Sequence, residues 1–393
     1  MMEGDAPAVP LSLPTQRTVE VEMLSDARTR SIIIQCALVA VAAAFAALLV
    51  STTFANLRAR GIPIGFDFLT MPSRIVISEA ILTYKSRDPY YWAIATGLAN
   101  TVFVSAVVIV FSSALGLVVG ITRLSSNPLA AGTCRVWVEV ARNSPPIVLL
   151  IFLYSLWWKV LPPVGEALNP LPGIYASMRG FVVPAVSMDV ATAGLLVIAL
   201  ALALAAAGWA AARRGWLPPL TAPAILTVGI AGLWLADAKF SVDWPTFTGS
   251  NFKGGKDLTP ELSTILIGLT IYTTGFVAEI VRGGVLSVGR GQWDAGHSLG
   301  LPRGKILRLI IIPQMLRVIV PPLNSQYINV VKNSTLAIAV GYPDFLAVMN
   351  TIISKSSHSI EGVFIILGVY LALNLSLSSA ANWYNRRIAI VER

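Results

Sequence analysis

The chain has 393 residues, enough for two or three soluble domains, but its composition argues against that class. Apolar residues make up 55% of the chain and charged residues only 12%, whereas a soluble domain carries about 25% charged residues. Too few charges remain to cover a surface in water, so lipid must be part of the solvent. The net charge of +9 comes from basic residues scattered singly between apolar runs, which favours membrane orientation over nucleic-acid binding.

The first segment, residues 1–30, is polar and contains proline and charges of both signs. A secretory signal needs an apolar core close behind a basic start, and none occurs before Ser31. We therefore expect residues 1–30 to form a disordered cytoplasmic tail.

Apolar runs of about 20 residues predict about eight membrane-spanning helices. In chain order they lie at Ser31–Val50, Ile94–Ile121, Val136–Leu161, Val190–Ala212, Leu220–Ala236, Leu262–Val281, Gln314–Val340 and Gly362–Trp383. The third of these runs is interrupted by Pro145–Pro146. An even number of spans places both termini on one side, and the basic residues of the short loops indicate that this side is the cytoplasm.

The segments that follow the first, third and fifth predicted spans are expected on the outer side of the membrane. The segment 51–91 is long, and within it Ser73–Lys85 carries spaced apolar residues that predict an interfacial helix. The stretches Leu161–Met188 and Lys239–Thr259 are rich in proline and aromatic residues, which indicates ordered extracytoplasmic loops.

One loop in the cytoplasmic set, 291–313, carries a functional pattern. Residues Gln292–Leu299 can form a short helix, which Gly300 would end in a left-handed conformation and Pro302 would prevent from continuing. Small residues on this helix, Ala295 and Gly296, allow close approach of another protein. Two apolar residues are candidate anchors for such a partner, namely Trp293 and Leu299.

The same loop resembles the signature of permease subunits of ABC importers. That signature is an acidic residue, two small residues, a glycine, an isoleucine and a proline at fixed spacings, and the matching positions are Asp294, Ala295, Gly296, Gly300, Ile310 and Pro313. The flanking stretches 142–145, 279–284 and 332–336 resemble the polar amino acid permeases, and the extra spans resemble the general L-amino-acid branch. Asp and Gly replace the usual Glu and Ala, and the glycine weakens the short helix by roughly 1 kcal/mol.

The resemblance implies an all-α integral membrane fold of the type I importer class. A core of five spans would lie within a permease domain at 92–387, joined by an extra N-terminal span at 31–50 and an inserted hairpin at about 190–236. The loop 291–313 would hold a coupling helix that an ATPase moves between two states. The implied partners are a second homologous permease, an ATPase dimer on the cytoplasmic side, a periplasmic amino-acid-binding protein and the bilayer of the cell inner membrane.

ATP hydrolysis is assigned to a partner because the chain has no phosphate-binding loop. Gly255-Lys256 and Gly304-Lys305 both lack the preceding glycine and the following hydroxyl residue that such a loop requires. We therefore expect ATP and magnesium to be used by the partner ATPase. Two isolated histidines, His297 and His358, and two cysteines in or beside apolar segments give no metal-ligand or disulfide pattern.

Ionisable and polar groups inside the spans are candidates for the substrate path. They are Arg142, Asn143, Glu279, Asn324, Lys332, Ser334 and Thr335. The break at Pro145–Pro146 either lines the path or is a structural kink in which Glu139 pairs with Arg142. For Glu279 and Arg282, three residues apart, an interfacial ion pair is the favoured interpretation.

Lys332 and the hydroxyls after it suit a carboxylate-bearing substrate or, equally, contacts with the partner permease. Pro321–Pro322 is expected to break the helix just upstream, close to Asn324, which slightly favours a cavity-lining role.

Two other classes of function share part of this pattern. An ion-coupled secondary amino acid transporter would show related halves and deep carboxylates, and a membrane enzyme would gather polar groups at one depth. The sequence shows neither feature, and both alternatives leave the loop 291–313 unexplained. The amino acid carried cannot be read from this chain.

Overall fold

The computed structural model describes residues 27–61, 63–188 and 240–388. Within these ranges, five helices are long and apolar enough to span a membrane, or six if one sharply bent helix pair counts as a single span. The predicted spans Val190–Ala212 and Leu220–Ala236, and most of the predicted tail, lie outside the described residues. The chain divides into two units, Met1–Gly65 and Phe66–Arg393.

The described part of the first unit forms the helix α2 (Ala27–Ala59), which is longer at both ends than the predicted span. Its residues from Arg30 onward are almost all exposed, and apolar side chains occur all around it. A helix that is apolar on every side satisfies its backbone internally and suits lipid.

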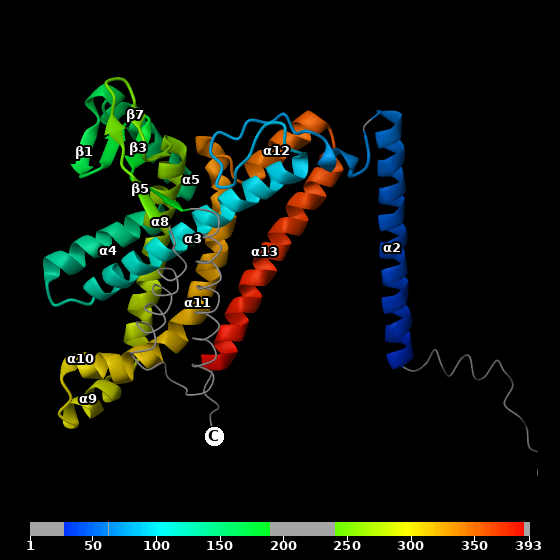
Figure 1. The fold of residues 1–393 in the computed structure, drawn as a ribbon. Helices are drawn as coiled ribbons and strands as arrows, with labels where there is room; N and C mark the ends of the chain where they lie inside the picture. The colour runs from blue at the N-terminus through cyan, green and yellow to red at the C-terminus, as the bar shows by residue number, and fades with distance from the viewer. Residues whose placement is uncertain (1–26, 62, 189–239, 389–393) are drawn as a thin grey trace, which may run out of the picture. The chain divides into compact units, whose positions relative to one another are not determined.

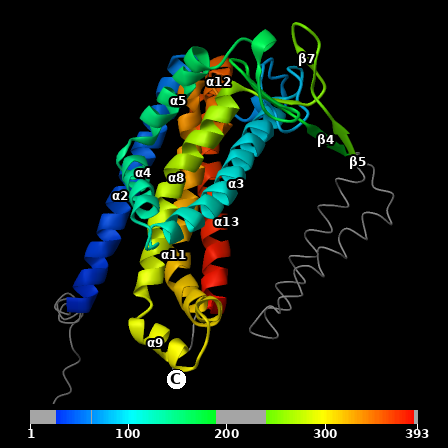
Figure 2. The ribbon, with the colours of Figure 1, turned by 90° about the vertical axis from the view of Figure 1, so that its left-hand side faces the viewer.

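In the second unit, the long helix α8 (Pro260–Ser287) is the central element (Figures 1 and 2). The helices that pack against it are α3 (Tyr90–Thr122), α4 (Pro128–Asn143), α5 (Pro146–Val160) and α11 (Ile312–Asn333). Small residues permit the closest of these approaches: a Cβ at Gly120 of α3 would lie 2.7 Å from the carbonyl oxygen of Ala278. Such small-residue contacts are a common basis of helix packing in membranes.

The predicted span Val136–Leu161 is corrected by the structure. It comprises two helices, α4 and α5, whose axes differ by 107°. The first helix, α4, begins at Pro128, eight residues before the predicted start at Val136. Asn127 caps it, since its side chain accepts from the N–H groups of Leu129 and Ala130. The extended conformation of Ser144 and Pro145, imposed by the two consecutive prolines, ends one helix and begins the next.

The predicted span Gln314–Val340 is also revised. A helix begins at α10 (Arg303–Ile306), passes through a π-helical turn at Leu307–Ile311 into α11, and ends as a 3-10 helix at Ser334–Val340. The prediction that Pro321–Pro322 breaks it is wrong, because both prolines lie inside α11. The carbonyls that lose their donors there belong to Arg317 and Val318, which are exposed residues.

Two helices complete the bundle. The helix α12 (Phe345–Ser356) packs on α3, and α13 (Ser359–Ile388) packs on α11 and α12. The last predicted span, Gly362–Trp383, lies within α13, whose apolar span is Ser359–Ser379.

The fold is mainly helical, as predicted, and it also contains small β-sheets at one end of the second unit, called here the β end (Figure 1). The largest sheet has the strand order β1-β2-β3-β8, and its pairs are antiparallel. The eight strands are β1 (Leu168–Leu171), β2 (Ile174–Ser177), β3 (Gly180–Val183), β4 (Ala185–Met188), β5 (Phe240–Asp243), β6 (Thr246–Phe247), β7 (Phe252–Lys253) and β8 (Lys256–Leu258). They fall in the two stretches that the sequence predicted as ordered loops.

The predicted interfacial helix at Ser73–Lys85 is wrong, because this stretch has an irregular backbone without a helix. The backbone N–H groups of Ser73 and Arg74 donate to the carbonyls of Asp88 and Ser86. The side chain of Ile75 is only 3% exposed and belongs to a cluster with Phe345 and Met349 of α12. Ile75 is therefore covered by the protein, whereas Val76 and Ile81 of the same stretch remain exposed.

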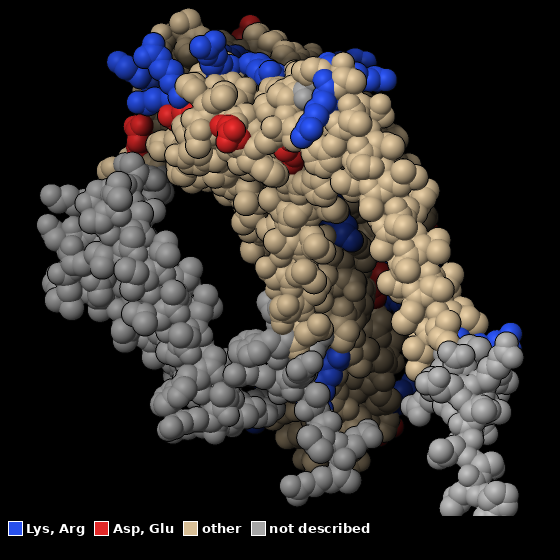
Figure 3. All heavy atoms as spheres, turned by 90° about the vertical axis from the view of Figure 1, so that its right-hand side faces the viewer, with Lys and Arg blue, Asp and Glu red and all other residues tan. Residues whose placement is uncertain are grey.

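Charged side chains mark the two ends of the second unit. Figure 3 shows Lys, Arg, Asp and Glu gathered at the β end of one face, above a band with few charges. The opposite end carries α9 (Arg290–Ser298) and is called here the α9 end (Figure 1). An apolar band between two charged ends is the surface expected of a bilayer-embedded protein.

Candidate functional site

The helix α9 ends in the manner that the glycine and proline predict. Gly300 has a φ of +67°, and its N–H donates to the carbonyl of His297. The N–H of Leu301 donates to the carbonyl of Gly296 at 3.2 Å. This pair of bonds is a Schellman motif, which satisfies the last carbonyls of the helix and fixes the direction in which the chain leaves.

Gly296 joins α9 to the rest of the protein. It is the buried residue of the helix, and a Cβ added to it would lie 2.8 Å from Cγ1 of Ile306. Ile306 itself is fully buried in an apolar cluster with Val288, Ile311 and Met315. A larger residue at 296 would therefore push α9 off this cluster.

Trp293 supports α9 from the inside, because it is partly buried against the same cluster. The side-chain amide of Gln314 on α11 also donates to that of Gln292 at 3.1 Å, which ties the two helices together. The residues Ile310 and Pro313 are half-buried in the turn where the chain enters α11. These contacts make α9 a supported element of the fold.

The outer face of α9 is open. Asp294 and Ala295 are exposed, and Leu299 has 75% of its side chain exposed at the helix end. Arg290, Lys305 and Arg308 are exposed in the same region. The face combines one large apolar side chain with cations and can bind another protein that offers an apolar groove with acidic edges.

A second cluster surrounds Glu279 on α8. One carboxylate oxygen accepts from Arg282 at 2.6 Å, and the other accepts from Arg123 and lies 3.8 Å from Arg142. The predicted pair of Glu279 and Arg282 is confirmed, while Arg123 was missed because it lies 156 residues away in the chain. The alternative pair of Glu139 and Arg142 is absent from the ion pairs of the described residues, and Glu139 is exposed.

The other predicted path residues do not gather into one site. Ser334 and Thr335 donate their hydroxyls to backbone carbonyls one turn earlier, so these groups are occupied within the helix. Lys332 is exposed and has no ion pair within the described ranges. Asn324 is half-exposed on α11, and Asn143 is the exposed last residue of α4.

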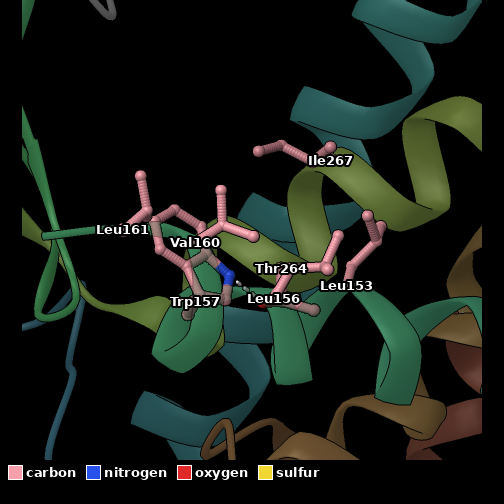
Figure 4. A pocket seen from close by; sticks show the side chains of 7 residues that line it. All are labelled: Leu153, Leu156, Trp157, Val160, Leu161, Thr264 and Ile267. Atoms are coloured by element: carbon pink, nitrogen blue, oxygen red, sulfur yellow. Dashed lines mark hydrogen bonds between the residues drawn. The ribbon is translucent and has the colours of Figure 1, made fainter.

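A small apolar cavity of about 160 Å³ lies between α5 and α8 (Figure 4). Its lining includes Leu153, Leu156 and Val160, and the indole N–H of Trp157 donates to the Thr264 hydroxyl at 2.6 Å. No charged residue lines it. The cavity is therefore unsuited to a zwitterionic ligand.

The β end contains buried carboxylates that the sequence did not single out, among them Glu79 and Asp344. Glu79 accepts from the Thr259 hydroxyl at 2.6 Å, and Asp344 accepts from the N–H of Ala347 at 2.8 Å. Burial raises the pKa of Glu79 and raises that of Asp344 to about 6, against the smaller effect of these hydrogen bonds. The only sequence signal was the position of Asp344 after Pro343, where it caps α12.

A family model described as the binding-protein-dependent transport system inner membrane component matches residues 112–390. The match covers α9, the Glu279 cluster and the bundle around α8. The chain belongs to this family. It is thus a transport component with several apolar membrane-spanning helices, in accord with the predicted permease fold.

Proteins similar to this chain over most of its length are named as amino-acid permeases. A putative amino-acid ABC transporter permease protein of Escherichia coli is 39% identical over 87% of this chain and 89% of its own length. The general L-amino acid transport system permease protein of Rhizobium johnstonii is 36% identical over 94% of each chain. A glutamate/glutamine/aspartate/asparagine transport system permease protein of Rhodobacter capsulatus is 31% identical over 94% of this chain and 96% of its own.

Proposed function

We propose that this chain is the permease subunit of an ATP-driven importer that moves L-amino acids across the inner membrane. The relatives that align over nearly its whole length are named amino-acid permeases, which supports this class of solute. The observation that carries the mechanism is α9, a short helix with an open outer face and a buried, glycine-based contact with the bundle.

The α9 helix is the coupling helix in this proposal. A partner ATPase dimer, which uses ATP and magnesium, binds the outer face around Asp294, Ala295 and Leu299. The Schellman motif and the Gly296–Ile306 contact keep α9 rigid, so a displacement by the ATPase is passed to α8 and α11. A rigid lever of this kind can bias a two-state bundle, whereas a flexible loop would absorb the displacement.

The remaining partners follow from the same proposal. The α9 end faces the cytoplasm with both termini, and the β end faces the periplasm, where an amino-acid-binding protein delivers the solute. A second, homologous permease completes the path. The concentration of exposed basic residues around α9 agrees with this orientation, because cytoplasmic loops carry an excess of Lys and Arg.

The test is a pair of glycine substitutions on α9. In Gly296→Val, the new side chain meets the buried Ile306, and α9 leaves its place. In the matched control Gly291→Ala, no atom lies within 4 Å of the added Cβ, so the helix is kept. We expect Gly296→Val to lose about 5- to 150-fold of both ATPase co-purification and ATP-driven amino-acid uptake, as roughly 1–3 kcal/mol of overpacking implies.

Insertion into the membrane is measured for both variants, so that a failure to fold is recognised. A second variant, Gly300→Val, disturbs only the left-handed end of α9 and tests the coupling role of this helix independently. If Gly296→Val and Gly300→Val both retain ATPase binding and uptake, the coupling role of α9 is wrong. If the unaltered importer takes up no amino acid with ATP, the proposed function itself is wrong.

A further inference from the structure

Arg142 is bound less tightly to Glu279 than the other two arginines of the cluster. Arg282 donates to one carboxylate oxygen through two nitrogens, at 2.6 and 3.2 Å, and Arg123 donates to the other oxygen. Arg142 Nη1 lies 3.8 Å from that second oxygen, which is beyond hydrogen-bonding distance. Its guanidinium therefore keeps its donors, even though it sits beside a carboxylate.

The cluster carries more positive than negative charge. Three guanidinium groups surround one carboxylate, and the nearest acid along α4, Glu139, makes no ion pair with Arg142 in the described part of the chain. The negative end of the α4 dipole offsets only about half a charge. Cations within membrane-spanning segments are costly unless an anion pairs with them or a water-filled path receives them.

The Arg142 side chain is positioned and at the same time accessible. Its guanidinium carbon lies 5.5 Å from the centroid of the Phe276 ring, a cation–π contact. Gly275 allows this approach, because a Cβ there would lie 3.3 Å from Cγ of Arg142. The side chain nevertheless remains 41% exposed, beside the exposed Asn143 and the bend between α4 and α5.

We propose that Arg142 binds the carboxylate of the transported solute at the bend between α4 and α5. A planar guanidinium with unused donors matches a carboxylate in a bidentate manner. Arg123 and Arg282 stay on Glu279, and the Arg123 pair holds α3 against α8 beside the bound group. This inference rests on the proposed function, since it names the contact that an amino-acid permease makes with the group common to all its solutes.

The experiment measures solute binding to the assembled importer without its binding protein, whose own affinity would mask the permease site. The complex is placed in nanodiscs of phosphatidylcholine. The probe is the radiolabelled amino acid that the unaltered importer takes up best, compared with its α-carboxamide. We expect millimolar or tighter binding of the amino acid, and about 10- to 100-fold weaker binding both of the carboxamide and of the amino acid to Arg142→Gln.

Two further variants make the result specific. Arg135→Gln removes an exposed arginine two turns earlier on α4 and is expected to bind like the unaltered complex, within about twofold. Arg142→Lys keeps the charge without the planar fork and is expected to bind about tenfold more weakly. It also replaces Arg142→Gln as the test if that variant does not assemble.

Three outcomes overturn the inference. The first is equal binding by Arg142→Gln and the unaltered complex, and the second is equal binding of the amino acid and its carboxamide. The third is no binding by the unaltered complex at about 10 mM amino acid, a concentration that would mostly fill a site with a Kd near 1 mM. A loss of the Arg142 effect when phosphatidylglycerol is added shows an anionic lipid at Arg142 and also overturns it. Absence of ATP-driven uptake by the unaltered importer contradicts the proposed function instead.

Discussion

The carboxylate of Glu279 and the buried carboxylates of the β end have their negative charge compensated in opposite ways. Glu279 has three arginines from three segments around it. Glu79 and Asp344 have neutral hydrogen-bond donors, and one oxygen of each has no partner among the described residues. The first cluster therefore holds helices together through charge, whereas at the β end burial raises the pKa of the acids, which have only neutral donors to offset it.

The largest effect is expected from Glu279→Gln. The substitution leaves three guanidiniums close together without a carboxylate, so α3, α4 and α8 lose their common partner. We expect a loss of stability on the order of 3 kcal/mol. Thermal unfolding in detergent measures it, with the exposed Glu139→Gln as the matched control. Equal melting temperatures for the two variants would show that the charge cluster does not stabilise the bundle.

A somewhat smaller effect is expected from Asn100→Leu at the β end. The buried side chain of Asn100 accepts from the N–H of Ile81 and donates to the carbonyls of Glu79 and Pro343, each of these two bonds being 2.8 Å long. Loss of these bonds is expected to cost about 2–3 kcal/mol and to release the 66–89 segment from α3. Hydrogen exchange of the Ile81 amide measures this release.

The control for that substitution is Asn350→Leu, which changes an exposed residue of α12. Its effect on hydrogen exchange in the 66–89 segment should be absent. If both variants leave the Ile81 amide equally protected, Asn100 is not what holds the segment to the bundle.

A smaller effect, a dependence of stability on pH, is expected at the β end. Burial raises the pKa of Asp344 from 3.8 to about 6, so the folded state binds more protons than the unfolded state between these values. Stability therefore falls as the pH rises from about 4 to about 6 and then levels off. We expect the melting temperature to be a few degrees higher at pH 5 than at pH 7.5. In Asp344→Asn this part of the dependence should vanish, and an unchanged pH profile would contradict the assignment.

The smallest effect is expected from Arg282→Gln. This arginine is 32% exposed and lies on the same helix as Glu279, which still retains Arg123. We expect a loss of about 1 kcal/mol or less. Arg142, already 3.8 Å away, is free to move closer, so the double variant Arg142→Gln/Arg282→Gln should lose more than the sum of the single losses. Additive losses of stability would show that Arg142 does not replace Arg282 as a partner of Glu279.

Local signals in the sequence predicted the parts of the fold that depend on neighbouring residues. The apolar runs located the spans within the described ranges, because backbone groups in lipid must be satisfied inside a helix. Gly300 and Pro302 predicted the end of α9, because the left-handed φ and the missing N–H are properties of those residues themselves.

Signals that depend on distant partners were misread or missed. The stretch Ser73–Lys85 was predicted to be an interfacial helix because of the spacing of its apolar residues, but the burial of residues such as Ile75 depends on α3 and α12. Pairing of β3 with β8 joins Phe181 to Leu258 across a long insertion, so no local pattern announces it. Trp293 was predicted to be an outward anchor, yet it is half-buried against the cluster around Ile306.

The sequence by itself determined that the chain spans a membrane, that a short helix ends at Gly300, and that its signature is that of an importer permease. The first two follow from side-chain hydrophobicity and backbone conformation, which act over a few residues, and the third is a resemblance to a known family. Only the tertiary structure decided that Arg123, Arg142 and Glu279 meet, and that Gly296 packs on Ile306. Such contacts depend on how the helices close on one another, and the residues that make them are far apart in the chain or meet only after a turn.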